Sequence, residues 1–304
     1  MATFTPGLVH TPVTPFARDL KIDVALYSKL LEFHLRNGAQ ALAVPTHAGE
    51  SVSLSDAEQR QLLDFTIKQV KGRVPVIAHV SDSGTAIAVD RARNAEKAGA
   101  AAIVATTPYY WTPPPAMIIE HFAQIAGAVS VPFYLLYAPQ EMGGIKLGTD
   151  FFMKLIDRVR NFAGVVDTSL DWQFMINVVS NAWRVKSEFQ LVSGTEYMVS
   201  AGAVGATSMF SSLSGVAPKA VAELFRICRT EQYRDARKVQ EDLAALRQLV
   251  KKYGAPGLKA AMAAMQRDCG EPRPPLATLG AEGRSKLATE LAAMPAFASE
   301  PRGW

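Results

Sequence analysis

Cysteine is scarce in this chain, in which only Cys228 and Cys269 occur among 304 residues. The two lie far apart and lack the short spacing of a metal site, whereas small secreted folds held by disulfides are dense in cysteine. We therefore expect two reduced thiols in a cytoplasmic protein.

Long apolar runs and clustered charges are also missing. No stretch approaches the roughly 20 apolar residues that a membrane span requires, and residues 1–7 lack the features of a secretory signal. The formal net charge is +4, but lysine and arginine are spread thinly and form no basic run with interleaved aromatic residues. We therefore expect neither a membrane nor a nucleic acid as partner.

What the chain does contain is an alternation of short apolar runs with amphipathic stretches, up to about residue 228. This alternation is typical of βα units and a parallel sheet. The expected strands are residues 8–11, 41–44, 74–79, 101–106, 132–137, 162–167, 189–193 and 205–210. Eight such units favour an α/β fold of the (β/α)8 TIM-barrel type over an open sheet.

The pattern changes to helix only beyond Arg226. Apolar residues recur at helical spacing within residues 233–253, and residues 257–265 and 284–294 are further expected helices. No linker is long enough to separate an independent domain. We therefore predict a barrel over residues 1–225 and a C-terminal helical region, residues 226–304, that packs on it.

Short motifs occur in a fixed order along the chain. They are Thr14-Pro15-Phe16, Ala48-Gly49-Glu50-Ser51, residues 73–78, Thr107-Pro108-Tyr109-Tyr110, Leu136-Tyr137, Val192-Ser193-Gly194, residues 216–219 and residues 272–276. In order and spacing, over residues 8–280, the chain resembles the dihydrodipicolinate synthase and N-acetylneuraminate lyase family of pyruvate-dependent class I aldolases. The resemblance implies a TIM barrel with its site at the C-terminal ends of the strands, and a lyase that needs no bound cofactor.

The residue on which the family's chemistry depends is replaced. The family ends its sixth strand with Gly-Ile-Lys-Asp-Ser-Ser, and the lysine forms a Schiff base with the oxo acid. Residues 164–169 of this chain read Gly-Val-Val-Asp-Thr-Ser, so Val166 stands in the lysine's place. Valine can neither attack a carbonyl nor carry a charge. Among the remaining lysines, Lys146 is the least implausible substitute.

Two histidines occupy strand ends at which the family has other residues. Thr46 is followed by His47 and Ala48 where the family has paired hydroxyls that hold the pyruvate carboxylate, and His79 replaces a glycine. An imidazole can hold an anion when protonated or transfer a proton when neutral. We predict catalytic roles for His47 and His79 and substrate-binding roles for Thr46 and Ala48; each histidine has a purely structural alternative.

Two tyrosines of the family's site are retained. By resemblance, Tyr137 corresponds to the phenol that relays protons beside the lysine, and Tyr110 to a loop tyrosine that reaches in from a neighbouring subunit. A phenol acts as a general acid or oxyanion donor without a Schiff base, or simply packs with its hydroxyl bonded to backbone. We predict both as catalytic, and expect a homodimer or homotetramer because the stiff apolar residues 111–115 suit packing against a partner.

The other predicted substrate-binding residues lie at the ends of the last three strands. They are Val166, Asp167, Thr168, Ser193, Gly194 and Phe210. The loop after the fifth strand lacks the arginine with which dihydrodipicolinate synthases hold their second substrate, which disfavours that synthase activity. A metal ion held by His47, His79 and Asp167 is chemically sensible, but the spacing matches no metal motif, and we predict no metal site.

Three interpretations remain open. The first is a lyase or hydratase that acts on a small oxo acid or related carbonyl compound without a lysine Schiff base. The second is a protein that binds a small carboxylate without catalysis. The third is a class I aldolase whose lysine has been mutated to Val166, which the accompanying changes at His47, Ala48 and His79 disfavour. The retained tyrosines and acquired histidines favour the first.

Overall fold

The structure, a computed structural model, describes residues 4–111, 113–140 and 145–304. Eight parallel strands follow one another in chain order and close into a barrel. The strands are β1 (Leu8–His10), β2 (Ala41–Val44), β3 (Val76–His79), β4 (Ala102–Thr106), β5 (Phe133–Tyr137), β6 (Phe162–Asp167), β7 (Gln190–Ser193) and β8 (Ser208–Ser211). The predicted (β/α)8 barrel is confirmed.

Helices alternate with these strands and then continue alone to the C-terminus. They are α1 (Val24–Arg36), α2 (Asp56–Val70), α3 (Thr85–Ala98), α4 (Pro115–Gly127), α5 (Thr149–Arg158), α6 (Trp172–Val185), α7 (Met198–Ala203), α8 (Pro218–Arg229), α9 (Tyr233–Lys252), α10 (Gly257–Ala264) and α11 (Ala281–Ala292). The three expected C-terminal helices are α9, α10 and α11. Within the described ranges, no helix is long and apolar enough to cross a membrane.

The chain forms two compact units, each of which is described by itself. The first unit consists of Met1–Gly7 and Pro75–Phe210, and contains β3 to β7, most of β8, and helices α3 to α7. The second unit consists of Leu8–Val74 and Ser211–Trp304, and contains β1, β2, α1, α2 and α8 to α11. The predicted division into a barrel over residues 1–225 and a helical region over residues 226–304 stays a prediction.

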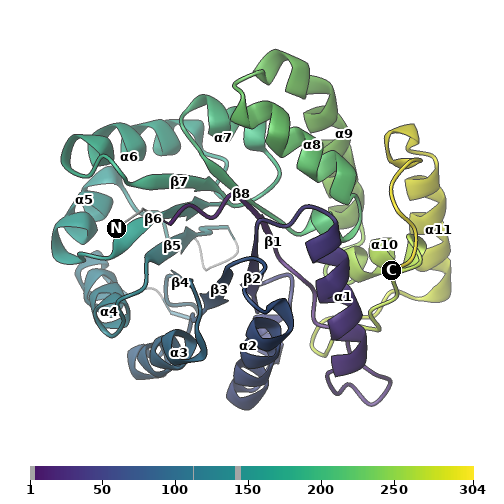
Figure 1. Ribbon diagram of the computed structural model, residues 1–304, viewed down its shortest axis with the longest axis horizontal. Coiled ribbons are helices and arrows are strands. Elements are labelled where there is room, and N and C mark those ends of the chain that lie inside the picture. Colours follow the sequence, from purple (N-terminus) through teal and green to yellow (C-terminus); the bar gives the residue numbers. More distant parts are fainter. Residues whose placement is uncertain (1–3, 112, 141–144) are drawn as a thin grey trace. The chain divides into compact units, whose positions relative to one another are not determined.

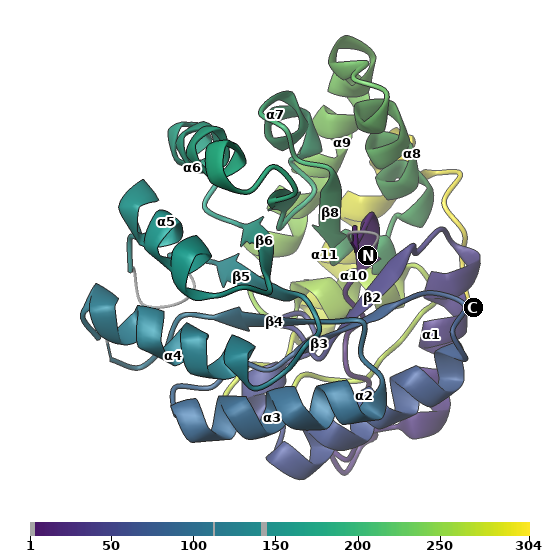
Figure 2. The same cartoon turned by 60° about the vertical axis from the view of Figure 1, so that its left-hand side comes forward.

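The strands of the first unit have a helix-facing side and an inner side. On β5, the ring of Phe133 packs on Phe122 of α4, with 5.5 Å between the ring centroids. The next residue, Tyr134, points the other way, and its hydroxyl donates to the carbonyl of Phe4 at 3.1 Å. Figure 1 and Figure 2 show α3 to α6 lying in turn along the outer side of their strands. Alternation along each strand therefore decides which residues face inward.

Candidate functional site

Val166 lies near the C-terminal end of β6 and is fully buried, with 0% of its surface exposed. It is paired in register with Leu136 of β5 and Val192 of β7. Paired residues of adjacent strands point to the same side of a sheet, and Leu136 lies two residues after the inward-pointing Tyr134. All three side chains therefore lie on the inner side of the sheet. At the position of the family's lysine, this side is lined by aliphatic side chains.

Tyr137 follows the inward-pointing Leu136 directly and therefore lies on the helix-facing side of β5. Its ring packs on Phe174 of α6 and Phe152 of α5, with centroid separations of 4.4 and 6.1 Å. Its hydroxyl accepts a hydrogen bond of 3.2 Å from the N–H of Leu147, and burial raises the pKa of the phenol. On the inner side of β5, the residue beside Val166 is therefore Leu136 and not Tyr137. A catalytic role of Tyr137 stays a prediction.

Asp167 shares the helix-facing side, because it is paired in register with Tyr137. Its Oδ1 accepts a hydrogen bond of 2.7 Å from the hydroxyl of Ser169, and its buried Oδ2 has no hydrogen-bond partner among the described residues. Desolvation by burial raises the pKa of this carboxyl to about 6, against the opposing effect of the bonds from Ser169. Asp167 is therefore a titratable group on the helix-facing side of β6 and not on its inner side.

Polar side chains gather on the inner side where β3 and β4 end. His79 is paired with Val104, which is itself paired with the inward-pointing Tyr134. Its Nε2 lies 2.8 Å from the hydroxyl oxygen of Ser81, and this oxygen accepts a hydrogen bond of 2.9 Å from the N–H of Thr106. The Ser81 hydroxyl thus engages both the His79 ring and the backbone of Thr106, and which of the two groups donates in the bond to Nε2 depends on the tautomer of the imidazole.

Thr168 and Gly194 join neighbouring strand ends. The N–H and the hydroxyl of Thr168 both donate to the carbonyl of Tyr137, at 2.9 and 3.2 Å. The N–H of Gly194 donates to the carbonyl of Asp167 at 2.7 Å. A Cβ at Gly194 would come within 2.4 Å of the Thr168 methyl group, so this close approach requires glycine. The predicted substrate-binding roles of both residues stay predictions, and their polar groups are engaged within the protein.

Ser193 and Phe210 lie on opposite sides of the strands. Ser193 is paired with the helix-facing Asp167, and its hydroxyl donates to the carbonyl of Thr195 at 2.7 Å. Phe210 follows Met209, which is paired with Ser193, so Phe210 points inward and is 5% exposed. Of this predicted pair, only Phe210 faces the inner surface formed by Val166.

Tyr110 lies in the loop after β4, with a side chain that is 100% exposed and a backbone φ of 81°. The preceding residue is held in place, because the hydroxyl of Ser83 accepts from the N–H of Tyr109 and donates to its carbonyl. Tyr110 therefore projects into solvent from an anchored loop. Its predicted contribution to a neighbouring subunit's site stays a prediction.

The predicted residues Thr46, His47 and Ala48 lie in the second unit, in the loop after β2. The carbonyl of Thr46 accepts from the N–H of Gly49 at 3.0 Å, and that of His47 accepts from the N–H of Glu50 at 2.9 Å. The hydroxyl of Thr46 is buried and has no hydrogen-bond partner among the described residues, whereas His47 is exposed and Ala48 half-buried. The loop thus offers one buried hydroxyl and one solvent-accessible imidazole to a ligand.

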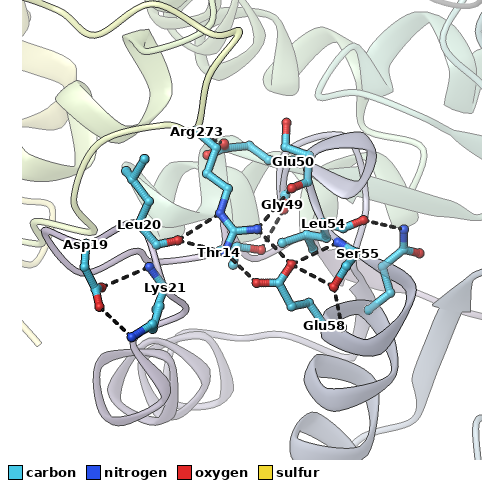
Figure 3. A network of polar contacts seen from close by, with 12 residues as sticks. Thr14, Asp19, Leu20, Lys21, Gly49, Glu50, Leu54, Ser55, Glu58 and Arg273 are labelled. Atoms are coloured by element: carbon cyan, nitrogen blue, oxygen red, sulfur yellow. Dashed lines mark hydrogen bonds and ion pairs between the residues drawn. The ribbon is translucent and has the colours of Figure 1, made fainter.

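Glu50 anchors this loop through a buried ion pair that sequence analysis missed. Its Oε1 lies 2.7 Å from Nζ of Lys259 on α10, and the two side chains are 7% and 6% exposed. Its Oε2 accepts a hydrogen bond from the N–H of Arg273, 223 residues away in the chain. The guanidinium of Arg273 also bonds to the carboxylate of Glu58 and the carbonyl of Leu20 (Figure 3). Desolvation lowers the pKa of Lys259.

The residues considered as metal ligands are not brought together within the first unit. His79 lies on the inner side, and Asp167 on the helix-facing side of the sheet. In the part of the chain that the structure describes, no three His, Cys, Asp or Glu side chains are grouped closely enough to hold a metal ion.

Ser81 and Thr106 are polar residues of the site to which sequence analysis assigns no role. Both stand at strand ends of a barrel, where ligand-binding groups are expected. Alternation along β4 was the available signal for Thr106, since it lies two residues from a position that faces inward.

A closed (β/α)8 barrel with polar and titratable side chains at the C-terminal ends of its strands is the architecture of a small-molecule enzyme. Residues 5–294 match the Dihydrodipicolinate synthetase family. The chain belongs to this family of lyases.

Curated relatives extend over nearly the same length. The 4-hydroxy-tetrahydrodipicolinate synthase of Bartonella tribocorum is 31% identical over 267 residues, which is 87% of this chain and 89% of that protein. The enzyme of the same name from Nitratidesulfovibrio vulgaris strain DP4 is 30% identical over 290 residues, covering 94% and 97% of the two chains.

Solved structures are similar in fold over the same extent. Dihydrodipicolinate synthase from Aquifex aeolicus has a TM-score of 0.88 at 26% identity, covering 96% of this chain and 99% of its own. The corresponding structure from Thermotoga maritima has a TM-score of 0.88 at 25% identity, covering 95% and 98%.

Proposed function

We propose that this protein is a lyase or hydratase that acts on a small oxo acid or related carbonyl compound without forming a lysine Schiff base. The observation that carries the proposal is the fully buried Val166 on the inner side of β6. Its inward-pointing neighbours in register are Leu136 and Val192, which carry neither an amine nor a phenol. An imine mechanism needs a nucleophilic amine at such a place.

The lysines of the first unit support this proposal, because no strand there carries one. Lys97, Lys146 and Lys154 are exposed on helices or loops. Lys186 donates to the carbonyl of Arg160 at 3.0 Å. A lysine becomes a nucleophile near neutral pH when burial or a neighbouring cation lowers its pKa. Burial lowers the pKa of Lys186, but its ammonium group is engaged by the Arg160 carbonyl, and the other three lysines are not buried.

His79 is the group that we propose for proton transfer. It lies on the inner side at the end of β3, and the Ser81 hydroxyl holds its ring orientation through Nε2. With Nε2 so engaged, Nδ1 is the atom that would exchange a proton with a substrate. A positioned imidazole contributes roughly 100-fold to 10,000-fold to such a reaction.

The absence of an imine is tested by borohydride reduction in the presence of pyruvate. We expect no increase in protein mass, because no nucleophilic lysine faces the inner side of the first unit. A mass increase equal to reduced pyruvyl-lysine would contradict the proposal, and a Lys146→Ala variant would show whether Lys146 is the modified residue.

Catalysis is tested by following short hydroxy-oxo acids with the protein by NMR, looking for carbon–carbon cleavage or loss of water. We expect His79→Ala to lower turnover roughly 100-fold or more. His121→Gln is the matched control, since His121 lies on α4 and bonds to the hydroxyl of Thr85 at 2.9 Å. Saturable binding with no turnover of any acid would instead support a non-catalytic carboxylate-binding protein.

A further inference from the structure

Thr106, the last residue of β4, has a buried hydroxyl that the protein itself does not use. The residue is 1% exposed, and its Oγ1 has no hydrogen-bond partner among the described residues. Thr106 is paired in register with Leu136, so its side chain lies on the inner side of the sheet. Leaving a buried hydroxyl unbonded destabilises a fold by about 1–3 kcal/mol. A ligand oxygen on the inner side would satisfy it.

Ser81 places this hydroxyl next to the proposed acid–base group. The oxygen of Ser81 lies 2.9 Å from the N atom of Thr106 and 2.8 Å from Nε2 of His79. One serine therefore fixes both the backbone that carries the threonine and the ring of the histidine. Thr106 and His79 thus place polar groups on the inner side at the ends of β4 and β3.

The following strands contribute a group of hydrocarbon side chains. Leu136, Val166 and Val192 are inward-pointing residues in register on β5, β6 and β7. Phe210 on β8 also points inward. The inner side of these strands therefore carries hydrogen-bonding side chains at the ends of β3 and β4 and hydrocarbon side chains on β5 to β8.

We propose that Thr106 Oγ1 and His79 form a binding site for an oxygen atom of the substrate, and that the substrate is an oxo acid with an aliphatic chain longer than that of pyruvate. The chain packs on Leu136 and Val166, while a carbonyl or carboxylate oxygen accepts from Thr106. This inference rests on the proposed function, since it names the substrate class of the same site.

The experiment measures binding of pyruvate, 2-oxobutanoate and 2-oxopentanoate by calorimetry. We expect affinity to rise about fourfold for each added methylene group, because each is buried against hydrocarbon. We expect the isosteric change Thr106→Val to weaken 2-oxopentanoate binding about tenfold or more, and Thr106→Ser to retain it. The melting temperature of ligand-free Thr106→Val should equal or exceed that of the wild type, because the change removes an unbonded buried hydroxyl.

Thr66→Val is the matched control. Thr66 is also a fully buried threonine, but its hydroxyl donates to the carbonyl of Leu62 at 2.7 Å and lies 3.0 Å from the hydroxyl of Tyr27. The control should lower the melting temperature and leave affinity unchanged.

Two results would overturn the proposal about Thr106. One is a Thr106→Val protein that loses stability as Thr66→Val does, and the other is wild-type affinity in Thr106→Val. Absence of saturable binding of all three acids would overturn it as well. The proposed function is judged separately by borohydride reduction and by turnover of hydroxy-oxo acids, so the two failures are distinguishable.

Discussion

At the residue scale, Asp167 makes the stability of the protein depend on pH. Its buried Oδ2 lacks a hydrogen-bond partner among the described residues, and burial raises the pKa of the carboxyl from 3.8 to about 6. Between these values the folded state keeps a proton that the unfolded state has released. The free energy of unfolding therefore falls as the pH rises from about 4 to about 6, and the loss persists above this range.

This prediction is checked with Asp167→Asn in urea unfolding between about pH 4 and pH 7. The variant should gain stability relative to the wild type as the pH rises through the window, because the amide does not ionise. Ser169→Ala should shift the window upward, since the Ser169 hydroxyl bonds to Oδ1 at 2.7 Å and stabilises the ionised form. An identical pH dependence in wild type and Asp167→Asn would refute the assignment.

A second residue-scale prediction concerns Val166→Lys. The new ammonium group would enter an aliphatic inner surface that contains Leu136 and Val192. We expect a loss of about 3 kcal/mol or more in the free energy of unfolding at neutral pH, as for other uncompensated buried charges. Part of this loss should be recovered at high pH, where the amine is neutral. Val166→Met, of similar length but uncharged, should lose only the roughly 1–3 kcal/mol that overpacking a core costs. Equal losses in the two variants would argue against an apolar environment.

At the scale of structural elements, the ion pair between Glu50 and Lys259 connects the loop after β2 with α10. Removing one partner leaves the other charge buried and unpaired. We expect Lys259→Met to lower the free energy of unfolding by about 3–5 kcal/mol. The double variant with Glu50→Gln should lose less stability than the sum of the losses in the two single variants.

Lys238→Met is the control, because Lys238 and Asp242 form an exposed pair at 2.7 Å on α9. The loss of stability in this control should stay below about 1 kcal/mol. Additive effects at the buried pair would contradict the coupling.

At the scale of the whole molecule, we predict a homodimer or homotetramer. Tyr110 is 100% exposed and Trp111 54% exposed in the loop after β4, and neighbouring exposed aromatic residues mark an interaction surface. Light scattering at micromolar concentration should give a mass of two or four chains. Tyr110→Asp with Trp111→Asp should shift the mass downward, whereas Val185→Asp, at a residue that is 70% exposed on α6, should not. A mass of one chain for the wild type would disprove the prediction.

The order of elements was predictable because each strand is a local apolar run and each helix has a local periodicity. The ends of β2 and β6 agree with the expected residues 41–44 and 162–167. The replacement of an amine by Val166 is equally a property of the sequence alone. These features depend on neighbouring residues or on residue identity, so no tertiary contact is needed to infer them.

Tertiary structure alone decided which side chains share a surface. Tyr137 and Leu136 are adjacent in sequence, but successive side chains of a strand point to opposite sides, so the register with β6 determines which of them stands beside Val166. The hydrogen bond from the Arg273 N–H to the Glu50 carboxylate joins residues 223 positions apart, and no local sequence pattern predicts it. The sequence by itself therefore determined the barrel and the missing nucleophile, whereas the inner surface depended on strand pairing and long-range packing, which follow from the energy of the whole fold.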